Sequence, residues 1–230
     1  MTVDAIRKRV GVLGTGPAGL AMGHAFVELG HEVMLGSREV PNDSTAEWKA
    51  EAGRRGFAGT FAEAAAFGEV VVVAIRGDAT EAVLRRVGHE PFGEKVVIDL
   101  TNPIDYSKRA TPTLFVGTTD SLGERVQKLL PDARVIKAFN TVGAGLFFRP
   151  QIADGRPDMF LAGNDFEARD VVVQVCEEFG WGTAYLGGIE SARYIEPMTL
   201  AWAGYALMTG GMGHAFKLLG KPPKPVIPGE

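Results

Sequence analysis

Short apolar runs alternate with longer amphipathic segments along most of the chain. The apolar runs have the length and the β-branched content of buried strands, and glycine, proline or polar residues bound them. The pattern predicts strands over residues 8–13, 32–35, 57–60, 69–75, 95–100, 134–139, 158–162 and 183–186. It predicts helices over residues 17–29, 45–55, 61–67, 78–87, 121–130, 166–179 and 191–209.

The regular alternation of strand and helix indicates a mostly parallel sheet with helices on both faces. We expect a Rossmann-type doubly wound α/β fold over residues 1–188. Residues 189–230 then form a short helical extension that closes the same domain, with a kink or a start near Pro197 and a break at residues 210–213. Residues 214–219 could add a turn. Asp43 or Ser44 is the expected cap of the second helix, and Asp78 that of the fourth.

The first predicted strand leads directly into a glycine-rich turn and then a helix. Gly14, Gly16 and Gly19 have the spacing of a dinucleotide-binding loop. Gly14 allows the tight turn, Gly16 lets a pyrophosphate approach the backbone, and Gly19 lets the helix pack close to its strand. Pro17 suits the first helical turn, where the missing N–H costs nothing. The helix N-terminus is then an anion site, and we expect a dinucleotide on it.

The residues at the end of the second predicted strand indicate which dinucleotide binds. An acidic residue there selects NAD by accepting hydrogen bonds from the ribose 2′-hydroxyl. This chain has Ser37-Arg38 instead. A guanidinium and a hydroxyl suit a 2′-phosphate, so the pair favours NADP(H) over NAD(H). Lys49 is a further candidate contact, and a solvated helix position explains it as well.

Three loops follow the later strands and should line the rest of the crevice. They are residues 74–78, 99–103 and 138–143. Ala74 and Ile75 open the first loop, and Asn102 and Asn140 offer amide groups to the nicotinamide and its ribose. Loop caps or Asx-turns explain the polar residues equally well.

The sequence shows no set of residues for acid–base, nucleophilic or metal chemistry. Arg193 and Glu196 are three apart on a predicted helix and should pair with each other. Cys176 lies in an apolar helical pattern and is expected to be buried. Hydride transfer between two bound cofactors needs orientation and exclusion of water more than an acid or base, so we expect no catalytic side chain and no metal. The histidines have no ligand spacing: His24, His31, His89 and His214.

Composition limits the size, the partners and the compartment that we expect for this protein. The chain has 230 residues, 46% of them hydrophobic, which is enough for one substantial core. The net charge of −4 and the lack of a basic tract argue against nucleic acid and anionic membranes as partners. The single cysteine and the polar N-terminus, which has no signal-peptide pattern, suit the cytoplasm.

With these motifs in place, the chain resembles the F420-dependent NADP oxidoreductases over nearly its whole length. The resemblance rests on the Gly14–Gly19 loop, on Ser37-Arg38 after Gly36, and on two C-terminal stretches, Ser191–Glu196 and Gly211–Gly213. It implies hydride transfer between NADP(H) and the deazaflavin coenzyme F420.

The resemblance implies a role for each of these stretches. The pyrophosphate would contact Thr15, Gly16, Pro17 and Ala18, and the 2′-phosphate would contact Ser37 and Arg38. The nicotinamide would lie near Ala138, Phe139 and Asn140, and the turn Gly211–Ala215 would close the pocket. The loops after Val73 and Lys137 depart from the family pattern, and both face the acceptor. FMN or FAD therefore stays open as the acceptor.

Two other functions are compatible with the sequence. An NADP-dependent imine or β-hydroxyacid reductase shares the cofactor fold. A module that senses NADPH without turnover shares the binding residues. The apolar helix over residues 198–208 fits either a homodimer contact or a core helix.

Overall fold

The computed structural model describes residues 8–105, 107 and 112–220. Strands and helices alternate along the chain, as the sequence pattern predicts. The strands are β1 (Arg9–Leu13), β2 (Glu32–Ser37), β3 (Gly56–Thr60), β4 (Val70–Val73), β5 (Val96–Asp99), β6 (Ile104–Asp105), β7 (Thr113–Leu114), β8 (Arg134–Lys137), β9 (Asp158–Gly163) and β10 (Gly182–Tyr185). The helices are α1 (Pro17–Glu28), α2 (Asp43–Ala52), α3 (Phe61–Phe67), α4 (Gly77–Val87), α5 (Leu122–Leu129), α6 (Phe166–Glu178) and α7 (Ala192–Thr209).

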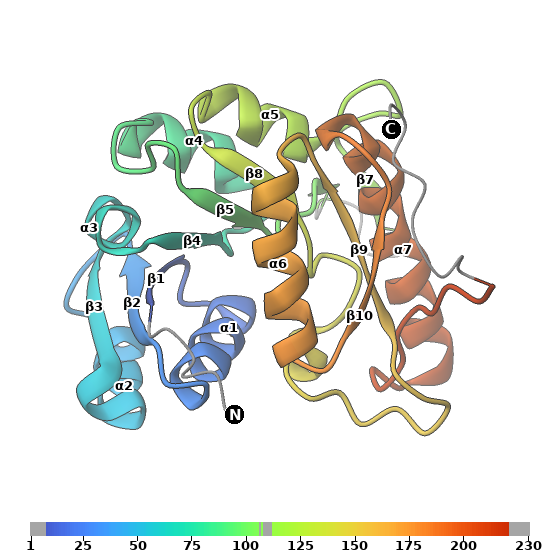
Figure 1. Ribbon diagram of the computed structural model, residues 1–230, viewed down its shortest axis with the longest axis horizontal. Coiled ribbons are helices and arrows are strands. Elements are labelled where there is room, and N and C mark those ends of the chain that lie inside the picture. Colours follow the sequence, from blue (N-terminus) through green and yellow to red (C-terminus); the bar gives the residue numbers. More distant parts are fainter. Residues whose placement is uncertain (1–7, 106, 108–111, 221–230) are drawn as a thin grey trace.

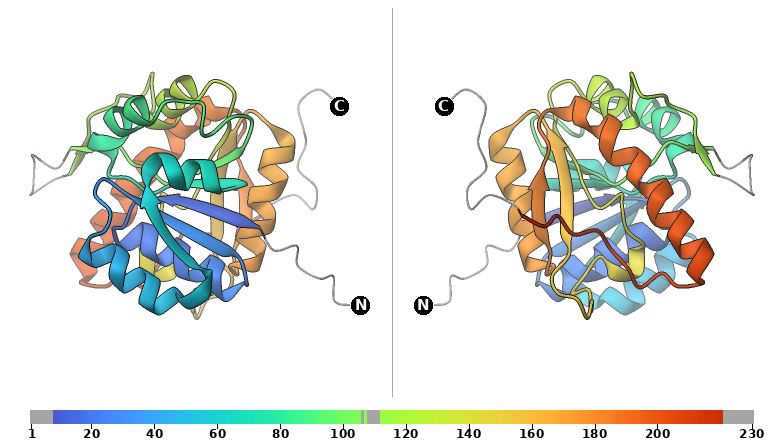
Figure 2. Two further views of the ribbon diagram at one scale, coloured as in Figure 1. Left: turned by 90° about the vertical axis from the view of Figure 1, so that its left-hand side faces the viewer. Right: turned by 90° about the vertical axis from the view of Figure 1, so that its right-hand side faces the viewer.

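Eight strands form one sheet in the order β10-β9-β8-β5-β4-β1-β2-β3. All neighbours are parallel except β8 and β9, which pair antiparallel. Helices α1, α2 and α6 cover one face of the sheet, and α3, α4, α5 and α7 cover the other (Figures 1 and 2). The expected Rossmann-type, mostly parallel doubly wound fold is confirmed.

The order of the strands reverses between β1 and β4, which lie side by side in the middle of the sheet. Chain connections leave these two strands toward opposite ends of the sheet, so the loops after them separate and leave a crevice. The Gly14–Gly19 loop follows β1, and Ala74 follows β4. The candidate residues thus lie where a doubly wound sheet binds its ligands.

Several local predictions need correction. Asn42, and not Asp43 or Ser44, caps α2, because its side chain accepts the N–H of Thr45. Arg76 is the N-cap residue of α4, so Asp78 lies inside the first turn. The short antiparallel pair β6–β7 was not predicted, because two-residue strands leave no periodicity to detect.

The chain after α7 also differs from expectation. Residues 214–218 form no helical turn and run alongside β9, where Asp158 N–H donates to Phe216 O at 2.9 Å. Gly210 ends α7 in the left-handed conformation, which glycine adopts without strain. The proline-rich residues 221–228 lie outside the described residues.

Helix α7 packs onto the strands at one edge of the sheet. Its Ile195 joins Phe160, Ala162 and Ala184 in a small apolar cluster. This contact places the C-terminal segment against the same sheet that carries the crevice (Figure 2, right). Among the described residues, no helix has the length and apolar character needed to span a membrane.

Candidate functional site

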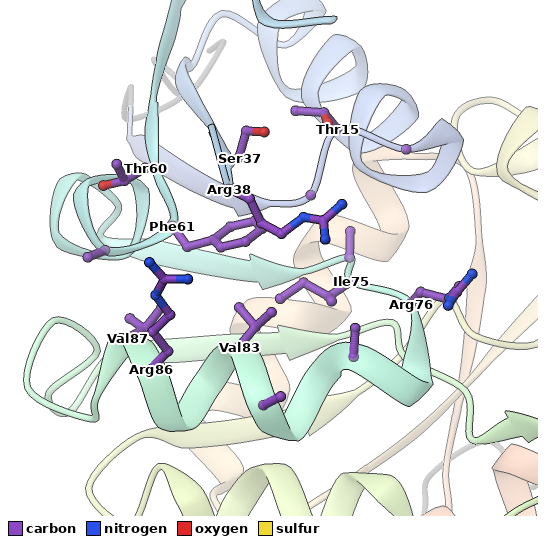
Figure 3. Close-up of a pocket in the computed structure, with 16 residues that line it drawn as sticks. Thr15, Ser37, Arg38, Thr60, Phe61, Ile75, Arg76, Val83, Arg86 and Val87 are labelled. Carbon is purple, nitrogen blue, oxygen red and sulfur yellow. The ribbon is translucent and has the colours of Figure 1, made fainter. Parts of the chain in front are cut away.

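A cavity of about 780 Å³ opens at the carboxyl ends of β1 to β4 (Figure 3). Its walls come from the loops after these four strands and from one face of α4. Seven of the residues expected to bind cofactor line it: Gly14, Thr15, Gly16, Ser37, Arg38, Ala74 and Ile75. The size is within the range of cofactor pockets.

The three loop glycines have different surroundings. A Cβ on Gly14 would lie 2.4 Å from Ala74 O, and one on Gly19 would lie 2.0 Å from Gly14 O. These two glycines are therefore required by the fold itself. A Cβ on Gly16 would meet no atom within 4 Å. The room beside Gly16 faces the cavity, next to the N-terminus of α1, and suits a phosphate group.

Ser37 and Arg38 stand at the outer part of the cavity. Ser37 is the last residue of β2, and Arg38 follows it with an exposed side chain. Among the described residues, no carboxylate pairs with the Arg38 guanidinium, so its charge is available to a ligand. Both residues also line a hollow of about 380 Å³ between Thr15 and the first residues of α2. Lys49 lies two turns further along α2 and lines neither space.

The opposite wall, which sequence reasoning missed, belongs to α3 and α4. Phe61 opens α3, and Val83 and Val87 present methyl groups from α4. Arg86 rises from α4 toward Thr60 and Phe61 (Figure 3). The α4 members have the spacing of one helical face: Ala79, Ala82, Val83, Arg86 and Val87. That spacing is visible in the sequence, but it reads equally well as a face toward the core.

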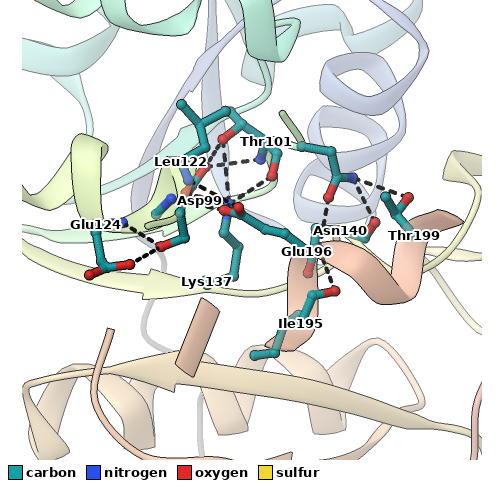
Figure 4. Close-up of polar contacts among 12 residues, drawn as sticks. Asp99, Thr101, Leu122, Glu124, Lys137, Asn140, Ile195, Glu196 and Thr199 are labelled. Carbon is teal, nitrogen blue, oxygen red and sulfur yellow. Dashed lines mark hydrogen bonds and ion pairs between the residues drawn. The ribbon is translucent and has the colours of Figure 1, made fainter. Parts of the chain in front are cut away.

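Of the expected nicotinamide residues, Asn102 and Asn140 do not line this cavity and instead form a polar link to α7. Asn102 Nδ2 donates to Asn140 O at 2.8 Å, and Asn140 Nδ2 donates to Asn102 Oδ1 at 2.9 Å. Asn140 also donates to Ile195 O, and Asn102 to Thr199 Oγ1, each at 3.4 Å (Figure 4). Both asparagines therefore join the loops after β5 and β8 to α7.

Other expected contacts lie outside the cavity lining. Ala138 is buried, and the Phe139 ring packs among Phe147 and Phe179 in the core. Pro17 and Ala18 directly follow Gly16 as the first residues of α1 and do not line the cavity. These residues shape the strand ends and the loop that face the crevice.

The turn after α7 is held by its neighbours. Trp202 Nε1 donates to His214 O at 2.8 Å, and the two rings stack. Ala215 is half-buried against the main core, whereas Met212 stays exposed. The expected closing turn is thus fixed to α7 and the edge of the sheet.

A buried ion cluster beneath these loops was also missed. Lys137 Nζ lies 2.7 Å from Asp99 Oδ2 and 2.9 Å from Glu196 Oε1 (Figure 4). The three side chains are 0%, 0% and 2% exposed. Lys137 also donates to Thr101 O at 2.7 Å, so all three of its N–H groups are used. Although burial lowers the pKa of Lys137, the carboxylates of Asp99 and Glu196 raise it above its usual value overall.

Glu196 has a second role in this cluster. Its carboxylate accepts the N–H groups of Leu122 at 3.0 Å and Gly123 at 2.9 Å, at the start of α5. The helix dipole there offsets the extra negative charge of the two carboxylates. The expected pairing of Arg193 with Glu196 is wrong: Arg193 pairs with Glu124 instead. Each residue of the pair finds its partner on α5 because α7 docks there.

Cys176 and His31 do not line the cavity. Burial raises the pKa of the Cys176 thiol, which is fully enclosed. Burial also lowers the pKa of His31, whose ring accepts the N–H of Lys8. No group of three or more His, Cys, Asp or Glu side chains in the described part of the chain could hold a metal ion.

The fold and the cavity are those of a Rossmann-type dinucleotide-binding protein. Residues 9–103 match the family described as "NADP oxidoreductase coenzyme F420-dependent". The chain is 32% identical to the F420-dependent NADP reductase of Methanothermobacter marburgensis, over 83% of this chain and 89% of that protein. It therefore belongs to the F420-dependent NADP oxidoreductase family.

Solved structures agree with this assignment. A crystal structure from Arthrobacter sp. FB24, provisionally named an F420-dependent NADP-reductase, is 34% identical. The match covers 92% of this chain and 99% of that one, with a TM-score of 0.86. The imine reductase of Bacillus cereus is 21% identical, covers 89% of this chain and 63% of its own, and has a TM-score of 0.62. That likeness shows a shared fold.

Proposed function

We propose that this protein binds NADP(H) along the crevice and transfers hydride between NADPH and coenzyme F420. The observation that carries the proposal is the pair Ser37-Arg38 at the end of β2. Both residues line the cavity, and the Arg38 guanidinium has no carboxylate partner within the described residues. A 2′-phosphate supplies two negative charges at this position. Family membership supplies the deazaflavin as the acceptor.

When bound, NADPH supplies the hydride, and the residues of the chain orient it. The open side of Gly16 and the N-terminus of α1 hold the pyrophosphate. Val83, Val87 and Phe61 offer an apolar wall to the adenine. The loops that carry Asn102 and Asn140 would hold the nicotinamide, and two mutual hydrogen bonds fix these loops to each other.

Direct hydride transfer fits the candidate nicotinamide residues, since Asn102 and Asn140 carry amides, which neither give up nor take up a proton. Lys137 is enclosed by two carboxylates and cannot give a proton to a substrate. An imine or β-hydroxyacid reductase would need a proton donor for the reduced nitrogen or oxygen. A flavin acceptor needs none, so FMN or FAD remains the second candidate.

One assay separates these functions. We would mix the protein with NADPH and add F420, FMN, FAD, ferric chelate and a small set of carbonyls and imines in turn. We expect loss of NADPH with F420, and slower or no loss with the others. Turnover with carbonyls or imines alone would contradict the proposal, and tight NADPH binding without any turnover would indicate a sensor.

We further propose that α7 pairs two copies of the chain. Tyr205, Leu207 and Met208 on the last turns of α7 and Met212 after it are all exposed, Met208 by 87%. Several large apolar side chains exposed near one end of a helix are typical of a protein contact. Light scattering should give a dimer for the wild type and a monomer for Leu207→Glu/Met208→Glu. The single, buried cysteine also fits a reducing compartment such as the cytoplasm.

A further inference from the structure

The hollow behind Arg38 contains a hydrogen bond that bears on cofactor choice. Asn42, the N-cap of α2, extends its side chain to the end of β2. Its Nδ2 lies 2.9 Å from Ser37 Oγ and donates a hydrogen bond to it. We propose that Asn42 is a positioning residue for NADP specificity, because it turns the Ser37 hydroxyl into a donor toward the 2′-phosphate. This inference rests on the NADP dependence proposed above.

The cap fixes which end of the Asn42 amide faces Ser37. Asn42 Oδ1 accepts the N–H of Thr45 at 3.0 Å, and Thr45 Oγ1 accepts the N–H of Asn42 at 2.9 Å. The oxygen of the amide is therefore committed to the helix. The NH₂ group must point the other way, where it donates to Ser37 Oγ and to Glu39 O at 2.5 Å. A flipped amide would lose the cap and both of these bonds.

This arrangement sets the polarity of the Ser37 hydroxyl. A serine hydroxyl has one hydrogen to donate and two lone pairs to accept with. Asn42 uses a lone pair, and no described residue accepts the hydrogen of Ser37. Ser37 is only 9% exposed, and the open space it faces is the hollow it shares with Arg38. A phosphate oxygen accepts hydrogen bonds. The Ser37 hydroxyl, whose hydrogen Asn42 leaves free to donate, therefore suits a 2′-phosphate.

The charges around the hollow make this donor important. Arg38 is the cation that lines it, whereas Glu39 and Asp43 bring carboxylates to the same space. Those carboxylates repel a phosphate, so Arg38 and the hydroxyl groups of the lining must hold it, and Ser37 is the hydroxyl that Asn42 orients. In Asn42→Asp, the carboxylate would keep the helix cap but could only accept a hydrogen bond from Ser37. In Asn42→Ser, the shorter side chain would keep the cap but would not reach Ser37.

The test compares Asn42→Ser and Asn42→Asp in the full chain. Dissociation constants for NADPH and NADH are measured by fluorescence titration, with Tm as the control for folding. We expect affinity for NADPH to fall about threefold in Asn42→Ser, by loss of one hydrogen bond. We expect a fall of about tenfold or more in Asn42→Asp, by reversal of that hydrogen bond together with the added negative charge beside the phosphate. Affinity for NADH should stay within about twofold for both.

A double variant shows whether Asn42 acts through Ser37. With Ser37→Ala already present, Asn42→Ser should cause no further loss of NADPH affinity, because the hydrogen bond from Asn42 to Ser37 is already lost. A wild-type preference for NADPH that persists in Asn42→Asp would overturn the inference and leave the proposed function standing. An equal loss for NADH would also overturn it. A wild type that binds both cofactors equally would overturn the NADP dependence itself.

Discussion

At the scale of single residues, Arg38 should decide between NADPH and NADH. Arg38→Ala removes the cation that, among the described residues, lines the hollow between Thr15 and the start of α2, where we propose that the 2′-phosphate binds. We expect it to lose about 2 kcal/mol of NADPH binding, roughly thirtyfold in Kd, because one charge-assisted contact goes. Affinity for NADH should hardly change. Titration of both cofactors measures the effect, and a variant that binds NADPH normally would contradict the role of Arg38 at the 2′-phosphate.

Arg86 should affect both cofactors alike. It lines the cavity from α4, beside Val83 and Val87 and away from Ser37. Arg86→Ala should therefore weaken NADPH and NADH by a similar factor of about three to ten, typical of one contact at the adenine. Arg85→Ala is the matched control, since Arg85 pairs with Glu81 outside the cavity. A loss confined to NADPH would place Arg86 on the phosphate instead.

The residues that the sequence predicts well are those whose neighbours in sequence define their place. Gly14, Gly16 and Gly19 lie in one loop, and Ser37-Arg38 directly ends a strand. Phe61 and Arg86 line the same cavity but come from elements that only the order of the strands brings together. A periodic face on α4 was visible, yet nothing local tells a cavity wall from a core contact.

At the scale of elements, the ion cluster anchors α7 to β5, β8 and α5. Lys137→Met would leave Asp99 and Glu196 buried side by side without their cation. We expect a loss of about 3–5 kcal/mol in the free energy of unfolding. Glu196→Gln is the matched control and should cost less, because the pair of Lys137 with Asp99 remains. Denaturant unfolding measures both, and equal costs would contradict this role for Lys137.

Most helices and strands follow from the sequence because their apolar spacing is strong. The predicted N-cap of α2 is one or two residues too far along the chain, since three residues that can cap a helix stand in a row: Asn42, Asp43 and Ser44. The pairing of Arg193 with Glu196 failed for a different reason. Spacing along a helix predicts local partners, whereas the docking of α7 on α5 supplied better ones.

At the scale of the whole molecule, the cavity and the C-terminal segment come from different parts of the chain. The first four strands of the sheet and α4 build the cofactor cavity. The C-terminal segment, α7 and the turn after it, joins the loops after β5 and β8 through Asn102 and Asn140.

The central claim is that hydride passes directly from NADPH to F420. Single-turnover mixing of the protein with F420 and NADPH carrying deuterium on the transferred position tests it, with mass spectrometry of the reduced deazaflavin. The account predicts one deuterium retained in the reduced F420, because no side chain takes part in the transfer. Reduced F420 that carries no deuterium, or no reduction of F420 at all, would contradict it.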